Sequence, residues 1–166
     1  AETPRRLASL PTWVIPLLAV IGVGVAGYLT YVESFNVQAV CGPVGNCNAV
    51  QSSPYALVFG ILPVGYLGLA GYASILLAWL VQQNSEARLK RWCGLAIWGM
   101  DVFGVLFSIY LTFLEPFVIG ATCAWCITSA VVMTLTLWAA TPAGKDALAM
   151  SESEDGNDVF VVDDGE

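Results

Sequence analysis

Four long apolar runs dominate this sequence, and they limit the folds open to it more than any other feature. They cover residues 12–32, 56–81, 92–114 and 119–140, and each is long enough for a helix to cross a bilayer, which takes about 20 residues. Only 11% of the residues are charged, whereas a typical soluble domain has about 25%. The sequence therefore predicts an all-α integral membrane protein built as a bundle of four transmembrane helices.

The runs divide the chain into three parts. We expect a short cytoplasmic lead over residues 1–11, a four-helix membrane catalytic domain over residues 12–140, and a cytoplasmic tail over residues 141–166. Eight of the thirteen Asp and Glu residues lie in the tail, which has little apolar content, so we expect it to be disordered. Pro142 and Gly144 are predicted to stop the fourth helix.

The positive charges predict an orientation. They lie before the first run, between the second and third runs, and after the fourth, whereas loops 33–55 and 115–118 have none. Because cytoplasmic loops are enriched in Lys and Arg, we predict that both termini are cytoplasmic and that these two loops face outward, in a multi-pass protein of the cell inner (cytoplasmic) membrane. The residues concerned are Arg5, Arg6, Arg88, Lys90, Arg91 and Lys145.

Two cysteine pairs lie on the predicted outer side. Cys123 and Cys126 are three residues apart at a helix start, so they share one face and are close enough to form a disulfide. A helix N-terminus stabilises a thiolate, which allows such a pair to be redox-active. Cys41 and Cys47 flank a turn-forming segment that lets them meet. The fifth cysteine, Cys93, is expected to be a passive residue at the cytoplasmic start of the third run.

Several other chemistries are less compatible with this chain. The sequence contains no histidine, which removes histidine-ligated haem, most copper sites and Ser-His-Asp hydrolysis. The four cysteines could hold zinc or an iron–sulfur cluster, or both pairs could be structural disulfides. A Cys-x-x-Cys closes almost no loop and stabilises little as a staple. We therefore favour dithiol exchange and predict no metal site.

A dithiol in the outer leaflet needs an acceptor for two electrons, and lipid-soluble quinones are the acceptors available in a membrane. Asp101, Ser108 and Thr112 recur at helical spacing in the third run, and such a polar stripe should face the bundle interior. It could accommodate a quinone head group near Cys126. Asp101 itself is open to two interpretations, a proton path or a hydrogen-bonded interior group.

The segments next to these runs carry local signals. Residues 48–52 are predicted to form a short half-helix in the first outer loop, on the membrane surface. Ser53 and Pro54 are predicted to begin the second transmembrane helix, which Pro63 should kink. Glu115 and Pro116 are predicted to end the third helix.

The combined order of these motifs resembles the vitamin K epoxide reductase family in its bacterial form, over nearly all of residues 12–140. Disulfide-bond protein B and its relatives also have four spans. They carry their Cys-x-x-Cys in the first outer loop and a widely spaced pair in the second, which is the reverse of the order here. The resemblance rests on Cys41-x5-Cys47, Ser52-Ser53, Phe-Gly-Ile-Leu-Pro at 59–63, and Cys123-Ala-Trp-Cys126-Ile-Thr.

The resemblance implies a membrane thiol:quinone oxidoreductase that drives disulfide-bond formation. A thioredoxin-like protein in its dithiol form would reduce Cys41, Cys47 would exchange with Cys123, and Cys126 would lie next to a quinone of the ubiquinone, menaquinone or phylloquinone type. It also implies a quinone pocket, whose expected residues are Val50, Ser53 and Tyr55. Ser53 is equally open to a simple capping role.

Two departures from the family leave alternatives open. Animal relatives have a tyrosine four residues after the last active cysteine, where this chain has Ala130, so epoxide chemistry is in doubt. Many bacterial relatives carry a fused thioredoxin-like domain, absent from these 166 residues; the partner is then a separate protein, or that domain was removed. The alternatives are a quinone or vitamin K epoxide reductase that serves quinone recycling, and a non-enzymatic scaffold or small transporter with structural disulfides.

Overall fold

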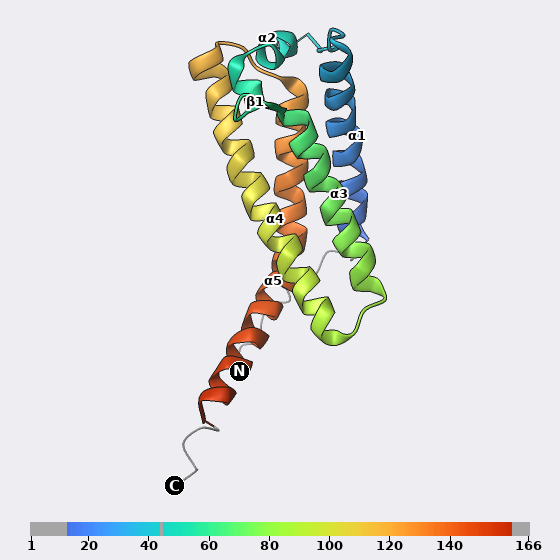
Figure 1. The fold of residues 1–166 in the computed structure, drawn as a ribbon, viewed down its shortest axis with the longest axis vertical. Coiled ribbons are helices and arrows are strands. Elements are labelled where there is room, and N and C mark those ends of the chain that lie inside the picture. The colour runs from blue at the N-terminus through green and yellow to red at the C-terminus, as the bar shows by residue number, and fades with distance from the viewer. Residues whose placement is uncertain (1–12, 44, 161–166) are drawn as a thin grey trace, which may run out of the picture.

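Four long helices form an elongated bundle in the computed structural model, which describes residues 13–43 and 45–160 (Figure 1). Each of the four is long and apolar enough to cross a membrane, which confirms the predicted all-α, four-span architecture. Helices α1 and α4 each pack against both α3 and α5. The expected cytoplasmic lead, with Arg5 and Arg6, lies outside the described residues. The four helices are α1 (Val14–Phe35), α3 (Val64–Gln83), α4 (Ala87–Leu114) and α5 (Ala124–Phe160).

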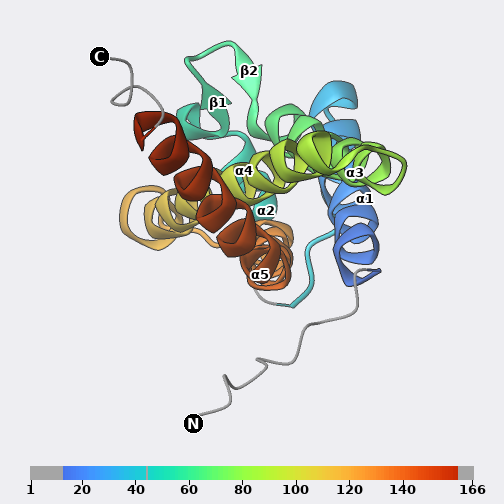
Figure 2. The same ribbon diagram turned by 90° about the horizontal axis from the view of Figure 1, so that it is seen from below.

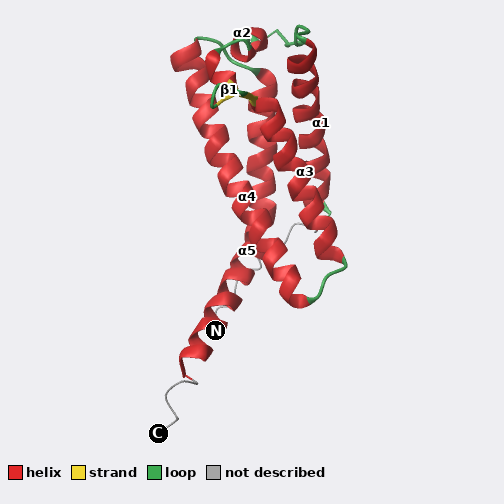
Figure 3. Ribbon diagram, viewed as in Figure 1, coloured by secondary structure: helices red, strands yellow, loops and turns green. Residues whose placement is uncertain are grey.

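Short elements gather at one end of this bundle (Figure 3). They are α2 (Cys47–Gln51), the 3₁₀ turn η1 (Pro54–Ala56) and a hairpin of β1 (Leu57–Val58) and β2 (Leu62–Pro63). Helix α2 is the predicted half-helix of the first loop. The α3–α4 turn, with Arg88 and Lys90 just after it, lies at the opposite end (Figure 1).

The second transmembrane helix begins at Val64, so the predicted start at Ser53 and Pro54 and the predicted kink at Pro63 are wrong. Ser53 precedes η1 and not this helix. Phe59 and Gly60 both have positive φ, 55° and 72°, the conformation of a type I′ hairpin turn. This turn pairs Leu57 with Pro63, and the helix starts only after the pairing ends.

The third and fourth helices are joined by a wider turn than predicted. Helix α4 ends at Leu114, close to the predicted end, but the chain continues as a π-helical turn, η2 (Glu115–Ile119). Gly120 then reverses the chain with a φ of 72°, a conformation that glycine adopts without steric cost. This turn points Glu115 back into the bundle, where it is buried.

The last helix extends well past its predicted end at Ala140. Helix α5 continues through Pro142 to Phe160 and projects beyond the bundle (Figures 1 and 2), so the expected stop at Pro142 and Gly144 is wrong, whereas the expected disorder of the acidic tail stays a prediction. Gly144 packs so closely on Trp98 that an added Cβ would lie 2.6 Å from its ring. This contact holds the helix past the proline. The expected disorder of residues 161–166 concerns positions outside the described part.

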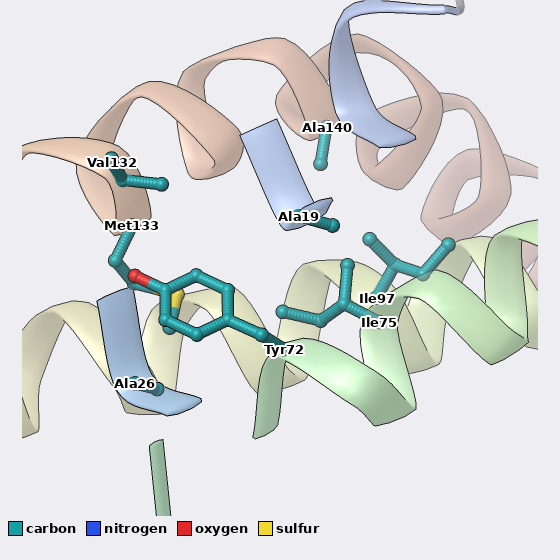
Figure 4. Packing of buried hydrophobic residues seen from close by; sticks show 8 residues of the cluster. All are labelled: Ala19, Ala26, Tyr72, Ile75, Ile97, Val132, Met133 and Ala140. Atoms are coloured by element: carbon teal, nitrogen blue, oxygen red, sulfur yellow. The ribbon is translucent and has the colours of Figure 1, made fainter. Parts of the chain in front are cut away.

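The middle of the bundle is held together by Tyr72. Its ring lies among buried side chains from all four helices (Figure 4), and a Cβ added at Gly22 would lie only 2.2 Å from it. The Tyr72 hydroxyl donates to the Ser129 carbonyl oxygen at 2.9 Å, which satisfies a polar group that would be costly to bury unpaired. One side chain of α3 thereby fixes the separation of α1 and α5.

Candidate active site

The loop cysteines form a disulfide between one partly exposed residue and one buried residue. Cys41 and Cys47 are bonded, with their Cα atoms 6.0 Å apart. Cys47 opens α2 and is fully buried, whereas Cys41 is partly exposed. Asn46 caps α2 by accepting a hydrogen bond from the Ala49 N–H at 3.2 Å. A thiol that approaches from solvent therefore meets Cys41 first.

The second pair is reduced in this structure and lies at the head of α5. Cys123 is fully buried and Cys126 is half-buried. The backbone N–H of Cys126 donates to the Cys123 sulfur at 3.4 Å. A hydrogen bond from the Cys126 thiol lowers the pKa of the Cys123 thiol, despite burial, which acts in the opposite direction. Within the pair, Cys123 is thus the sulfur whose ionisation its neighbour favours.

The backbone holds the cysteine loop directly against the second pair. The Asn46 N–H donates to the Thr122 carbonyl oxygen at 2.9 Å. Gly45 has a φ of 98°, and a Cβ there would lie 2.4 Å from the same oxygen, so only glycine fits. Cys47 and Cys123 belong to one buried cluster. The fold therefore brings together the two cysteine pairs that the sequence singled out.

Aromatic residues clamp the segment that leads to Cys41. The Trp125 indole donates to the Val40 carbonyl oxygen at 3.0 Å, and the Val40 N–H donates to the Tyr28 hydroxyl at 2.9 Å. The two rings contact each other, with centroids 4.6 Å apart. Asn48 adds a further bond, because its side-chain oxygen accepts from the Ala39 N–H at 2.8 Å. Sequence reasoning did not find Tyr28 or Asn48, since nothing local marks them.

A cavity of about 440 Å³ lies inside the bundle below this end, and Cys126 forms part of its wall. This size is typical of small-molecule sites. Val50 and Tyr55, two of the three predicted pocket residues, also line it. The third, Ser53, is not among the lining residues, and its hydroxyl donates to the Val50 carbonyl oxygen at 2.6 Å.

The predicted polar stripe of the third helix divides between two places. Ser108 and Thr112 line the cavity, as does Gly104 between them and Asp101. Asp101 is fully buried away from the cavity wall, and neither carboxylate oxygen has a hydrogen-bond partner among the described residues. The stripe does face the bundle interior, but its acid is separate from the site.

Glu115 is the functional candidate that the sequence analysis missed. Its Oε2 atom accepts a hydrogen bond from the Cys123 backbone N–H at 2.9 Å, and its side chain lines the cavity beside Cys126. The available signal was an acid inside an apolar stretch, eight residues before Cys123, which was interpreted only as a helix end. In the part of the chain described, no group of three or more Cys, Asp or Glu residues is placed to hold a metal ion.

Fold and site together define a class: a four-helix membrane protein whose paired cysteines meet at one end of the bundle, above an internal cavity. The family model described as "Vitamin K epoxide reductase family" matches residues 13–141. The chain therefore belongs to the vitamin K epoxide reductase family. Members are membrane oxidoreductases whose chemistry is linked to quinones and to thioredoxin-like partners.

Proposed function

We propose that this protein is a membrane thiol:quinone oxidoreductase that oxidises a thioredoxin-like dithiol protein outside the cytoplasmic membrane and so drives disulfide-bond formation. One observation carries the proposal: a partly exposed cysteine, Cys41, is bonded to a buried one, Cys47, whose loop is fixed against a Cys-x-x-Cys pair that borders an intramembrane cavity. This arrangement connects a solvent-facing disulfide to the interior of the bilayer. Structural staples would not need that connection.

The exposures of the cysteines suggest an order of exchange. A thiolate of the partner attacks Cys41, and its second thiol releases the partner as a disulfide, leaving Cys41 and Cys47 as thiols. Cys47 then attacks Cys123 of the oxidised Cys123–Cys126 pair, which forms a Cys47–Cys123 bond and frees Cys126. Cys41 resolves this bond and restores the loop disulfide. Two electrons have then reached the Cys123–Cys126 pair.

The cavity fits a quinone head group in size and lining. Its walls are mostly apolar side chains, with a few polar groups such as Ser108 and Thr112, the mixture typical of small-molecule sites. A bound quinone would accept two electrons and two protons. Cys126, Val50 and Tyr55 are proposed to contact it.

Ser53 is proposed to act differently from these contacts. Its hydroxyl is engaged by the Val50 carbonyl, so we assign it to positioning Val50 and the end of α2. The cysteine end of the bundle is proposed to face outward, because Arg88 and Lys90 follow the turn at the opposite end and cytoplasmic loops are enriched in such residues.

The test is dithiol oxidation by the purified protein in lipid nanodiscs, with dithiothreitol as donor and a short-chain ubiquinone or a menaquinone analogue as acceptor. Wild-type protein and Cys93→Ser should reduce the quinone, seen as a loss of quinone absorbance, and this rate should fall to background in Cys126→Ser. Cys93 serves as the control because it lies at the other end of α4. Wild-type rates in Cys126→Ser would refute the mechanism. In the same variant the Cys123 thiolate should attack Cys47 of the loop disulfide and release Cys41 as a thiol. Without Cys126 to resolve it, the Cys47–Cys123 disulfide should accumulate, visible by peptide mapping.

A further inference from the structure

Glu115 is a buried acid with one oxygen engaged and one free. Its side chain is 1% exposed. The Oε2 atom accepts from the Cys123 N–H at 2.9 Å, whereas Oε1 has no hydrogen-bond partner among the described residues. A carboxylate inside a membrane bundle is costly and commonly marks a functional site. Capping Cys123 explains only one of its two oxygens.

The Glu115 carboxyl group lies close to the reactive sulfurs. Glu115 and Cys126 line the same cavity, and Glu115 is near enough to interact electrostatically with both Cys123 and Cys126. Helix α2, which packs on this turn, contributes no charged side chain. The other titratable groups on the cavity are Glu33, Tyr55 and Tyr72, and no described Lys or Arg lines it. Nothing described therefore pairs the free oxygen with a cation.

We propose that Glu115 is the proton-transfer group of the Cys123–Cys126 pair, taking the proton of the Cys126 thiol and delivering it to the cavity. The inference rests on the proposed function. When the pair is oxidised, both S–H bonds break, the Cys123–Cys126 bond forms, and two electrons and two protons leave for the quinone. Glu115 accepts the proton of the Cys126 thiol and passes it to the cavity, so its carboxylate is regenerated. The second proton is the one that Cys123 loses.

Glu33 is the matched comparison. It is also a carboxyl group on this cavity, and its Oε2 atom likewise has no hydrogen-bond partner among the described residues. It lies instead beside Gly65, where a Cβ would be 2.5 Å from that oxygen, between α1 and α3. Replacing Glu33 therefore removes a cavity carboxyl without touching the Cys123 backbone contact.

The first experiment needs no quinone. In Cys93→Ser/Cys123→Ser protein with the loop disulfide intact, Cys126 is the one free thiol among the five cysteines of the chain. The rate at which methyl methanethiosulfonate converts it to the methyl disulfide, with methanesulfinate leaving, is followed against pH. If the thiol proton moves to Glu115, the rate is nearly constant between about pH 6 and 8, because no proton leaves the pair. Glu115→Gln should restore an ordinary rise of about tenfold per pH unit. Glu33→Gln should keep the plateau.

The outcomes separate the possible roles. A tenfold-per-unit rise with Glu115 present overturns the proposal. So does a rate that increases on Glu115→Gln, since this is the result expected when the carboxylate acts only by opposing the thiolate charge. Glutamine can still accept from the Cys123 N–H, and Glu115→Asp, which retains the acid, should recover part of the plateau. The aspartate variant also covers the case in which the glutamine variant does not fold.

The second experiment measures turnover. Glu115→Gln should slow quinone reduction by about 100-fold, a typical contribution of general acid–base catalysis, while Cys126→Ser/Glu115→Gln still accumulates the Cys47–Cys123 disulfide. Unchanged turnover would overturn the proposed role of Glu115 but not the proposed function of the protein. If wild-type protein reduced no quinone, the proposed function would fail, but the pH plateau would still report whether Glu115 takes the proton.

Discussion

The indole N–H of Trp125 donates a hydrogen bond to the carbonyl oxygen of Val40, 3.0 Å away and 85 positions earlier in the chain. Trp125 stands between Cys123 and Cys126, and Val40 immediately precedes Cys41. One side chain between the two cysteines of the helix pair thus holds the segment that presents the loop pair. This hydrogen bond therefore holds the loop cysteine pair in a fixed position relative to the helix cysteine pair.

Trp125→Phe should therefore slow transfer between the pairs. Phenylalanine can keep the ring contact with Tyr28 but cannot donate to Val40, and a lost hydrogen bond is worth about 1 kcal/mol, or about fivefold in rate. The measurement is the rate at which the Cys47–Cys123 disulfide accumulates in a Cys126→Ser background. Trp138→Phe, on an exposed face of α5, is the control and should leave this rate unchanged.

Gly45→Ala should undock the cysteine loop. A Cβ at this position would lie 2.4 Å from the Thr122 carbonyl oxygen, and the φ of 98° is unfavourable for alanine. Strain of this kind costs about 1–3 kcal/mol, so we expect a lower midpoint of thermal unfolding and slower Cys47–Cys123 exchange. Gly42→Ala meets nothing within 4 Å and should behave as wild type. Equal behaviour of the two variants would contradict the docking of this loop.

Hydropathy and cysteine spacing were sufficient to predict the parts of this fold that depend on local sequence. Four apolar runs become four long helices because a bilayer requires internally bonded backbone, and the half-helix after Cys47 follows from its position in the loop. The prediction at Pro63 failed because Pro63 is the last residue of a hairpin, and the helix begins only after it. That hairpin places Phe59 at a positive φ, which no sequence rule assigns to a bulky aromatic residue.

The remaining differences come from tertiary contacts. Pro142 does not stop α5, since Gly144 packs on Trp98 and neighbouring helices can support a proline in a membrane helix. The roles of Tyr28 and Glu115 depend on partners that α1 and η2 reach only after folding. Both were invisible to periodicity, although an acid within an apolar stretch was a signal that could have been followed.

Gly22→Ala should destabilise the bundle, whereas Gly24→Ala should not. The first places a Cβ 2.2 Å from the buried Tyr72 ring, and the second meets nothing within 4 Å. Overpacking of this kind costs about 1–3 kcal/mol, while alanine for glycine in an open helical position gains up to about 1 kcal/mol. Unfolding in dodecylmaltoside, followed by circular dichroism, measures both. A stable Gly22→Ala variant would mean that Tyr72 can leave its place in the core.

Cys126→Ala should raise the pKa of Cys123. The Cys126 thiol donates the hydrogen bond that most lowers the pKa of the Cys123 thiol, and alanine cannot replace it. In a Cys41→Ser/Cys47→Ser/Cys93→Ser background, where no loop disulfide can trap Cys123, a smaller fraction of Cys123 would then be thiolate at neutral pH. Its reaction with methyl methanethiosulfonate, followed at the Cys123 peptide, should slow and its pH midpoint should move upward. Serine still offers a hydroxyl donor, so Cys126→Ser should lie between wild type and alanine. An unshifted midpoint in Cys126→Ala would show instead that the backbone N–H groups of Trp125 and Cys126 set the reactivity of Cys123.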